Sequence, residues 1–148
     1  MKKTSSAIAV ALFSIGLFVA AHAARSNYTG TWEIDLRSAS ERKANIECGS
    51  ATFKLKQVGN KITGEHTFAT VGCGRLNDGG EGTVQGNVHG GKAMLLVTSG
   101  RNGAIVRGTA ELKGSNLLWQ TLEEIKPGVP EGDSPLILGH GVLHRVGK

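Results

Sequence analysis

Two stretches in which polar and apolar residues alternate lie next to one another in this chain, at residues 50–58 and 61–69. Alternation with a period of two is typical of a strand with one buried face. Only Gly59-Asn60 separates the two stretches, and a two-residue turn of this kind predicts a β-hairpin in which Val58 pairs with Lys61. We therefore expect this hairpin to be the element around which the fold is organised.

The two cysteines of the sequence flank the hairpin. If Val58 pairs with Lys61, the same register places Cys48 opposite Val71, two residues before Cys73. A pair of this kind persists as a disulfide in an oxidising compartment. The spacing thus predicts a disulfide between Cys48 and Cys73 that closes the base of the hairpin.

Six further segments have the pattern of strands, and turn signals separate them at intervals of nearly ten residues. They are residues 28–37, 83–89, 93–97, 106–112, 117–123 and 136–146. Between residues 38 and 48 the alternation breaks, and Ser38 with Glu41 has the spacing of a capping box, which predicts a single helical turn. Residues 75–82 form a glycine-rich turn, and residues 124–135 hold all three prolines and form the longest loop.

Eight strands without a long helix predict an all-β fold, either a sandwich or a barrel. Mid-strand glycines at positions 64, 86 and 108 share a face with the apolar residues around them. Glycine on an inward face is explained if strands coil sharply or if the interior must keep space. We predict an eight-stranded antiparallel up-and-down barrel in which His66 is the one ionisable side chain that points inward.

The N-terminal residues have the pattern of an export signal. Lys2 and Lys3 precede an apolar run, and Ala21-His22-Ala23 matches a signal-peptidase site. We expect residues 1–23 to be removed and residues 24–148 to form one domain, periplasmic or secreted and not attached to a membrane. Loss of the two lysines lowers the formal net charge from +5 to +3, and the remaining basic residues are scattered, which argues against a nucleic-acid surface.

At low identity the chain resembles the avidin and streptavidin family, within the lipocalin-like (calycin-type) barrels. The stretches that carry the resemblance are Thr29-Gly30-Thr31-Trp32, Gly49-Ser50-Ala51-Thr52-Phe53 with Ile62-Thr63-Gly64, and Leu118-Trp119 with Leu138-Gly139-His140. Positions that match the family's polar contacts to biotin hold Ile34, Ala51, His66, Phe68 and Gly141. The resemblance therefore implies the barrel, whereas these substitutions predict that biotin is not bound.

No catalytic signature appears in the sequence, and we expect neither an enzyme nor a cofactor. Glu123 and Glu124 are adjacent and would face opposite sides of a strand, so they cannot act together as acid and base. His140 and His144 would share a face of the last strand, but four residues along a strand span roughly 13 Å, too far for one metal ion.

Two functions fit this description. In the first, the barrel carries a small, largely apolar ligand at its mouth, bound by His66, Phe68, Trp119 and Trp32, with residues 124–135 as a lid. In the second, the barrel binds a protein, as periplasmic inhibitors of proteases or lysozymes do, through its loops or an arm at residues 24–28. An open interior would favour the carrier and a filled one the inhibitor. The run at residues 93–97, apolar on both faces, suggests a homo-oligomer.

Overall fold

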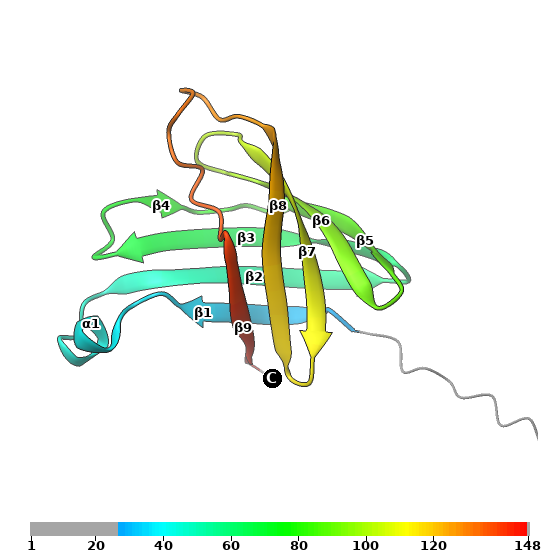
Figure 1. Ribbon diagram of the computed structural model, residues 1–148, viewed down its shortest axis with the longest axis horizontal. Coiled ribbons are helices and arrows are strands. Elements are labelled where there is room, and N and C mark those ends of the chain that lie inside the picture. The colour runs from blue at the N-terminus through cyan, green and yellow to red at the C-terminus, as the bar shows by residue number, and fades with distance from the viewer. Residues whose placement is uncertain (1–26, 148) are drawn as a thin grey trace, which may run out of the picture.

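The computed structural model describes residues 27–147, which form a closed barrel of eight antiparallel strands (Figure 1). The elements are β1 (Gly30–Asp35), α1 (Ala39–Lys43), β2 (Cys48–Val58), β3 (Lys61–Val71), β4 (Leu76–Asn77), β5 (Val84–His89), β6 (Lys92–Thr98), β7 (Ile105–Lys113), β8 (Asn116–Lys126) and β9 (His140–Val146). The barrel strands follow the order β2-β1-β9-β8-β7-β6-β5-β3, and β3 closes the sheet by pairing with β2. The predicted fold class is confirmed, and the expected signal peptide at residues 1–23 lies outside the described residues.

The central hairpin has the predicted register. Val58 pairs with Lys61 across the turn, and Cys48 lies opposite Val71 at the far end. Cys48 and Cys73 form a disulfide, with their Cα atoms 5.2 Å apart. The predicted disulfide is therefore confirmed, and it closes the end of the hairpin next to α1.

The single helical turn is also confirmed. Ser38 caps α1 by accepting a hydrogen bond from the Glu41 backbone N–H, and the Glu41 carboxylate accepts one from the Ser38 N–H in return. This reciprocal pair is a capping box. Within residues 27–147, no helix has the length and apolar character needed to cross a membrane.

Side chains alternate between the barrel interior and its outer surface as the sequence predicts. The fully buried inward side chains include Ala51, Phe53, Ile62, His66, Val84, Ala93, Leu95, Val97, Ala110, Leu117 and Leu143. On β6 the apolar run divides, because Met94 and Leu96 point outward and remain exposed. Their neighbours on the adjacent strands include Asn87, Thr109 and Arg107, which are polar, so the apolar outer surface at β6 is small.

The inward glycines allow neighbouring groups to approach closely. A Cβ atom at Gly64 would lie 2.1 Å from the Lys54 carbonyl oxygen, and one at Gly86 would lie 2.0 Å from that of Met94. At Gly108 the same atom would lie 2.4 Å from the indole ring of Trp119. Of the two explanations offered by the sequence, retained interior space is therefore not the one that the structure supports, because strands or side chains fill the positions that a larger residue would occupy.

The main differences from the predicted boundaries are three. The glycine-rich turn contains the short strand β4, which adds to β3 at Phe68 and Ala69. Strand β8 extends to Lys126 through two register shifts in its pairing with β7. The last strand begins at His140, because residues 136–139 leave the sheet and fold against the barrel, with Leu136 at a φ of 49°.

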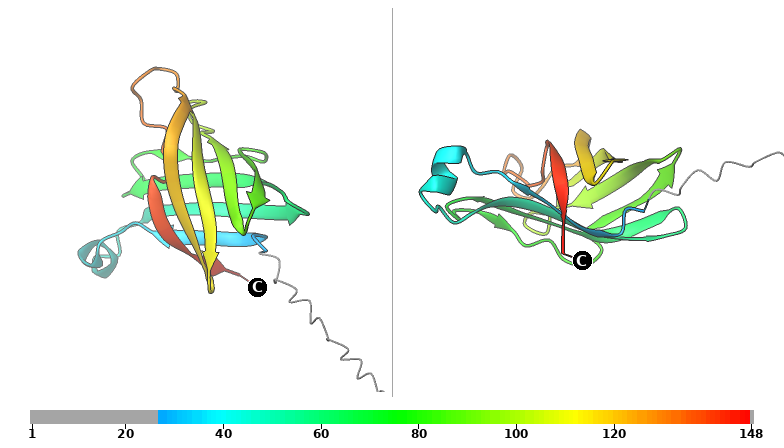
Figure 2. Two further views of the ribbon diagram at one scale, coloured as in Figure 1. Left: turned by 45° about the vertical axis from the view of Figure 1, so that its right-hand side comes forward. Right: turned by 90° about the horizontal axis from the view of Figure 1, so that it is seen from below.

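The two ends of the barrel differ in construction. At one end, tight turns join the strands and Tyr28 is fully buried, with its hydroxyl donating to the carbonyl oxygens of Gly91 and Ala110. Trp32 lies next to it and donates to the Tyr28 carbonyl at 2.9 Å, and the Arg145 guanidinium covers the Trp32 ring. The expectation of a free arm is thus wrong for Tyr28, and residues 24–26 of that arm lie outside the described residues. At the other end, which we call the mouth, α1 and the loop after β8 project at separate places on the rim (Figure 2).

Candidate functional site

His66 lies on β3 inside the mouth and is fully buried. Its Nε2 accepts a hydrogen bond from the backbone N–H of Leu138 at 3.2 Å, so its Nδ1 carries the proton and donates to the Thr52 carbonyl at 2.9 Å. Burial lowers the pKa of His66 to about 4, which keeps the ring neutral at physiological pH. Both ring nitrogens are therefore occupied by backbone groups.

Two aromatic rings, those of Phe53 and Trp119, form a cluster with this histidine. The Phe53 ring stacks on His66 with centroids 4.3 Å apart, and the centroid of the Trp119 ring lies 4.9 Å from that of Phe53. Trp119 donates from Nε1 to the Leu138 carbonyl at 2.6 Å. Phe53 was not among the predicted site residues, although the hairpin register, which pairs Phe53 with His66, could have identified it.

The interior beside these rings is filled. Side chains that line a void large enough for water have accessible surface, and Phe53, His66, Leu95 and Val97 have none. Within residues 27–147 no buried side-chain nitrogen or oxygen lacks a hydrogen-bond partner. The core around Phe53, His66, Leu95 and Val97 is therefore packed.

The four residues predicted to bind a ligand do not form one group. His66 and Trp119 meet at Leu138, where both bond to its backbone. Phe68 is partly buried and pairs with Asn77 of β4, whereas Trp32 lies toward Tyr28 at the closed end. A shared role in binding stays a prediction for this set.

Residues 135–139, which we call the plug, cover the mouth. The Asn77 side chain donates to the Leu136 carbonyl at 3.1 Å, and the Ser99 hydroxyl donates to the Pro135 carbonyl at 2.7 Å. The Thr121 hydroxyl donates to the Leu138 carbonyl, which Trp119 also contacts. The plug is thus fastened by side chains from four strands and loops, and it follows the segment 124–135 that the sequence predicts as a lid.

Asn77 is the residue that ties the plug to the neighbouring loops. Its side-chain oxygen accepts hydrogen bonds from the backbone N–H groups of Gly79 and Gly100, at 3.1 and 3.0 Å. Substitution Asn77→Ala removes a buried side chain that makes these two bonds and the bond to Leu136, so we expect a loss of about 2 kcal/mol in the free energy of unfolding. Urea denaturation measures this loss, and the exposed Asn87→Ala is the matched control. Equal stability of the two variants would contradict the assigned role.

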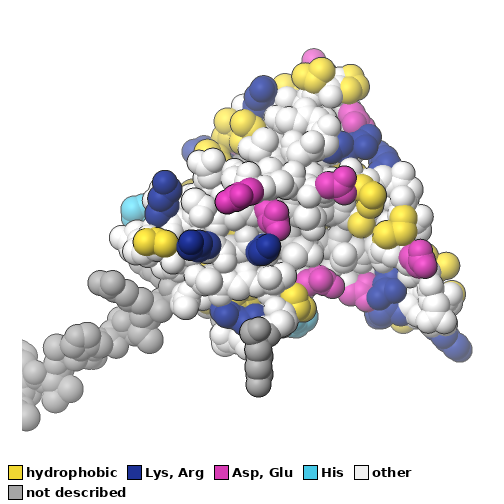
Figure 3. Space-filling model, turned by 180° about the vertical axis from the view of Figure 1, so that it is seen from behind, with side chains coloured by type: hydrophobic (Ala, Val, Ile, Leu, Met, Phe, Trp, Pro, Cys, Tyr) yellow, Lys and Arg dark blue, Asp and Glu magenta, His cyan; other side chains and the backbone are white. Residues whose placement is uncertain are grey.

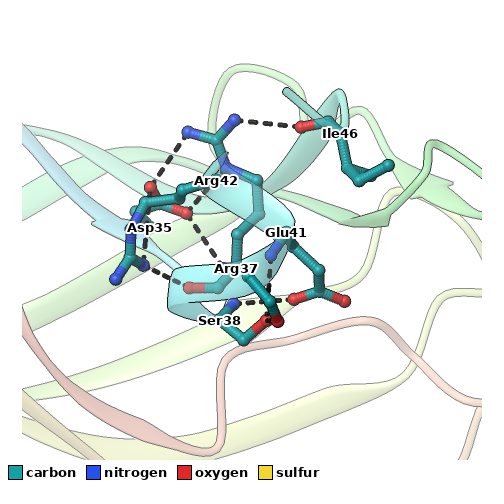
Figure 4. A network of polar contacts seen from close by, with 7 residues as sticks. Asp35, Arg37, Ser38, Glu41, Arg42 and Ile46 are labelled. Atoms are coloured by element: carbon teal, nitrogen blue, oxygen red, sulfur yellow. Dashed lines mark hydrogen bonds and ion pairs between the residues drawn. The ribbon is translucent and has the colours of Figure 1, made fainter. Parts of the chain in front are cut away.

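A network of polar contacts holds the segment that carries α1 (Figure 4). The Asp35 carboxylate accepts hydrogen bonds from the backbone N–H, Nε and Nη2 of Arg37, which lower the pKa of Asp35 to about 2. Arg37 also donates to the Ile46 carbonyl at 3.0 Å, and Arg42 donates to the Arg37 carbonyl. Together with the nearby disulfide, these contacts fix this loop at the rim.

The loop after β8 is braced by Asn102. The Asn102 carbonyl accepts from the Val129 N–H at 2.9 Å, and its side chain donates to the Asp133 carbonyl at 3.0 Å. Gly128 lies so close to this side chain that an added Cβ would be 2.2 Å from the amide nitrogen. Arg101 and Asp133 form an ion pair at 3.0 Å. The loop is therefore fixed at its base while its tip projects from the barrel.

A groove of about 580 Å³ lies on the outer wall, beside β2, β3 and the loop before β5. Two lysines and two glutamates line it, namely Lys54, Lys56, Glu65 and Glu81. Lys54 pairs with Glu65 at 3.6 Å. Because the charges balance, the groove favours neither anions nor cations, and it is separate from the predicted mouth site.

The arrangement at the mouth suits packing and hydrogen bonding rather than metal chemistry. In the part of the chain that the structure describes, no three His, Cys, Asp or Glu side chains are grouped so that they could hold a metal ion. His140 and His144 are exposed, and His144 contacts the Asn116 side chain at 2.9 Å. In comparisons with known proteins, no family model, no curated sequence and no solved structure matches this chain.

Proposed function

We propose that this chain is an exported, non-enzymatic barrel that binds another protein and blocks it, as an inhibitor of a protease or lysozyme does. The observation that carries the proposal is the packed core at the mouth, where His66 is fully buried and the plug bonds to its ring. A protein with a packed interior binds through its outer surface. The loops at the mouth are the parts of that surface that project.

The bracing of these loops supports the proposal. Binding orders flexible side chains and loops at a cost in free energy, and a loop already held in its bound shape avoids that cost. Arg37 fixes the α1 segment, and Asn102 fixes the loop after β8. Two rigid projections on one rim resemble the preorganised surfaces of protease inhibitors.

The carrier hypothesis remains the alternative, and it requires the plug to leave the mouth. A ligand that contacts His66, Phe68, Trp119 and Trp32 has to displace Leu138, whose backbone bonds to His66, Trp119 and Thr121. Breaking these bonds leaves buried polar groups unpaired unless the ligand replaces each one. We therefore place this function second.

We also propose that the likeness to the avidin type is limited to the barrel architecture. Gly141 and Ile34 are in contact inside the barrel, since a Cβ at Gly141 would lie 2.8 Å from the Ile34 side chain. Neither residue offers a hydrogen bond to a ureido group, and Ala51 beside them is equally apolar. We expect titration calorimetry with free biotin to give no heat of binding. Submicromolar affinity would contradict this prediction.

A panel of enzymes tests the proposed function. The exported, oxidised protein is mixed with trypsin, chymotrypsin, pancreatic elastase, subtilisin and lysozyme, and complexes are separated by size-exclusion chromatography. We expect a stoichiometric complex with loss of activity for at least one enzyme. If no enzyme is bound and a small molecule is found in the purified protein, the carrier hypothesis replaces this proposal.

A further inference from the structure

The mouth presents hydrogen-bond donors to the plug. The Leu138 carbonyl oxygen accepts two of them, from Trp119 Nε1 at 2.6 Å and from the Thr121 hydroxyl at 2.9 Å. The Asn77 side chain donates to a further carbonyl of the plug. Among the strand side chains that the structure describes, only His66 accepts a hydrogen bond from the plug. A site of this composition suits a ligand that presents oxygen acceptors.

We propose that the mouth binds the carboxylate of an apolar organic acid. In the absence of the acid the plug occupies this site, with the Leu138 carbonyl oxygen in the place of a carboxylate oxygen. Two donors that converge on one oxygen stabilise negative charge on that oxygen. This inference goes beyond the proposed protein-binding function, which uses the outer surface, so the enzyme panel succeeds or fails independently of it.

The plug competes with any ligand for these donors, because it belongs to the same chain. Hydrogen bonds to an ionised acceptor are roughly twice as strong as bonds between neutral groups. A carboxylate therefore binds Trp119 and Thr121 more strongly than the Leu138 carbonyl does. The side chains of Leu136 and Leu138 are 5% and 4% exposed, and release of the plug makes the apolar space that they fill available to the body of the acid.

His66 supplies the positive charge that a buried carboxylate requires. A proton on Nε2 makes this atom a donor, which fits a carboxylate oxygen and no longer fits the Leu138 N–H. The groups that contact His66 are uncharged, namely Thr52, Phe53, Thr83 and Leu138. Burial lowers the pKa of His66, and a carboxylate beside the ring raises it again. Binding of the acid therefore takes up a proton, and the plug stays in place at pH 8.

The surroundings of the mouth offer the acid no competing site. Glu65, the ionisable residue next to His66 in the chain, pairs with Lys54 on the outer wall. Acidic and basic side chains are intermixed on the face seen in Figure 3, so that face has no broad basic patch. The carboxylate is thus recognised by the buried donors and not by the surface charge.

The backbone of the plug is suited to release. Leu136 has a φ of 49°, in the left-handed region that bulky side chains rarely adopt. Such conformations persist where the surroundings hold them, and they cluster at ligand clamps and switch regions. The plug lies outside the sheet, since β9 begins at His140. Displacement of the plug therefore relieves strain and leaves the strand ladders intact.

Calorimetry of the oxidised protein with decanoate tests the inference, in two buffers that differ in their heat of ionisation. At pH 6 we expect one decanoate per barrel, with uptake of about one proton, and a dissociation constant that falls roughly tenfold between pH 6.5 and 5.5. Methyl decanoate has the same chain without the charge, and we expect it to bind at least about tenfold more weakly. No binding of decanoate, or equal binding of acid and ester, overturns the inference.

Two variants and one further measurement place the acid at the mouth. Thr121→Val removes one donor at nearly the same volume, and we expect binding to weaken about tenfold. Thr109→Val, on the outer face of β7, is the matched control, with a change of less than about twofold. His66→Gln is expected to bind without proton uptake. Thermal unfolding establishes that the variants are folded, and Thr121→Val decides the test if His66→Gln does not fold.

Hydrogen exchange of residues 135–139 reports whether the plug leaves. We expect these amides to exchange faster in the complex of wild-type protein with decanoate than in the free protein at the same pH, because the acid takes the place of the plug. Unchanged protection in the complex, or Thr121→Val that binds decanoate as well as wild type does, shows that the acid binds elsewhere and overturns the inference.

Discussion

Lowering the pH from 7 to 4 is expected to remove about 3 kcal/mol from the free energy of unfolding, with His66 as the source. Burial lowers the pKa of His66 to about 4 in the folded barrel, against 6.5 for an ordinary histidine. Between these two values the unfolded chain binds a proton that the folded chain does not bind. Stability therefore falls as the pH falls from 6.5 to 4, and this contribution becomes constant below that range.

Protonation also acts on the plug. A proton on Nε2 turns this atom from an acceptor into a donor, so it can no longer accept the Leu138 N–H. Asp35 acts at lower pH, because Arg37 lowers the pKa of its carboxyl to about 2, and its contribution is lost as the pH falls from 3.8 toward 2. His66 and Asp35 therefore change the stability of the protein in different pH ranges.

Urea denaturation at several pH values measures the effect of His66. The variant His66→Gln keeps one donor and one acceptor but does not titrate, so we expect its stability to vary much less between pH 6.5 and 4. His144→Gln, on the outer surface, is the control and should retain the wild-type pH dependence. A pH dependence in His66→Gln equal to that of wild type would refute the assignment.

Removal of the disulfide between Cys48 and Cys73 is expected to cost about 3.5 kcal/mol, the loop-closure entropy of a 25-residue separation. The bond joins two segments that are already adjacent, since the Gly72 N–H donates to the Glu47 carbonyl at 2.9 Å. The cross-link restricts the unfolded chain more than it changes the folded one. The main effect is therefore a lower free energy of unfolding with the same barrel.

Two measurements check this prediction. Titration of the denatured, unreduced protein is expected to detect no free thiol, and two free thiols would disprove the bond. Denaturation of wild-type protein with and without a reducing agent gives the difference in stability. The double variant Cys48→Ser/Cys73→Ser is the control, because the reducing agent should leave its stability unchanged.

Local patterns in the sequence predict the barrel well. The turn at Gly59-Asn60 sets the register of β2 and β3 over their whole length, and with it the position of both cysteines. Period-two alternation places Phe53 and His66 inside, because a strand with one buried face cannot shift by one residue without exposing its core. Ser38 and Glu41 are three residues apart and form the capping box by which the sequence predicts α1.

The plug could not be predicted in the same way. Its contacts join residues far apart in the chain, such as Asn77 with Leu136 and His66 with Leu138, and hydrogen bonds of this kind have no periodic pattern. The apolar residues at 136–138 therefore looked like the start of the last strand. Whether the interior is open or filled was equally hidden, because an inward Gly108 is compatible with a void and with the Trp119 ring that occupies its place.

The central claim is that the barrel is filled by its own side chains and binds through its outer surface. Native mass spectrometry of the protein, purified without denaturation, tests it most directly. We expect a mass equal to that of the polypeptide with one disulfide, for each subunit present. A larger mass that returns to this value on denaturation, with release of a small organic molecule, would contradict it.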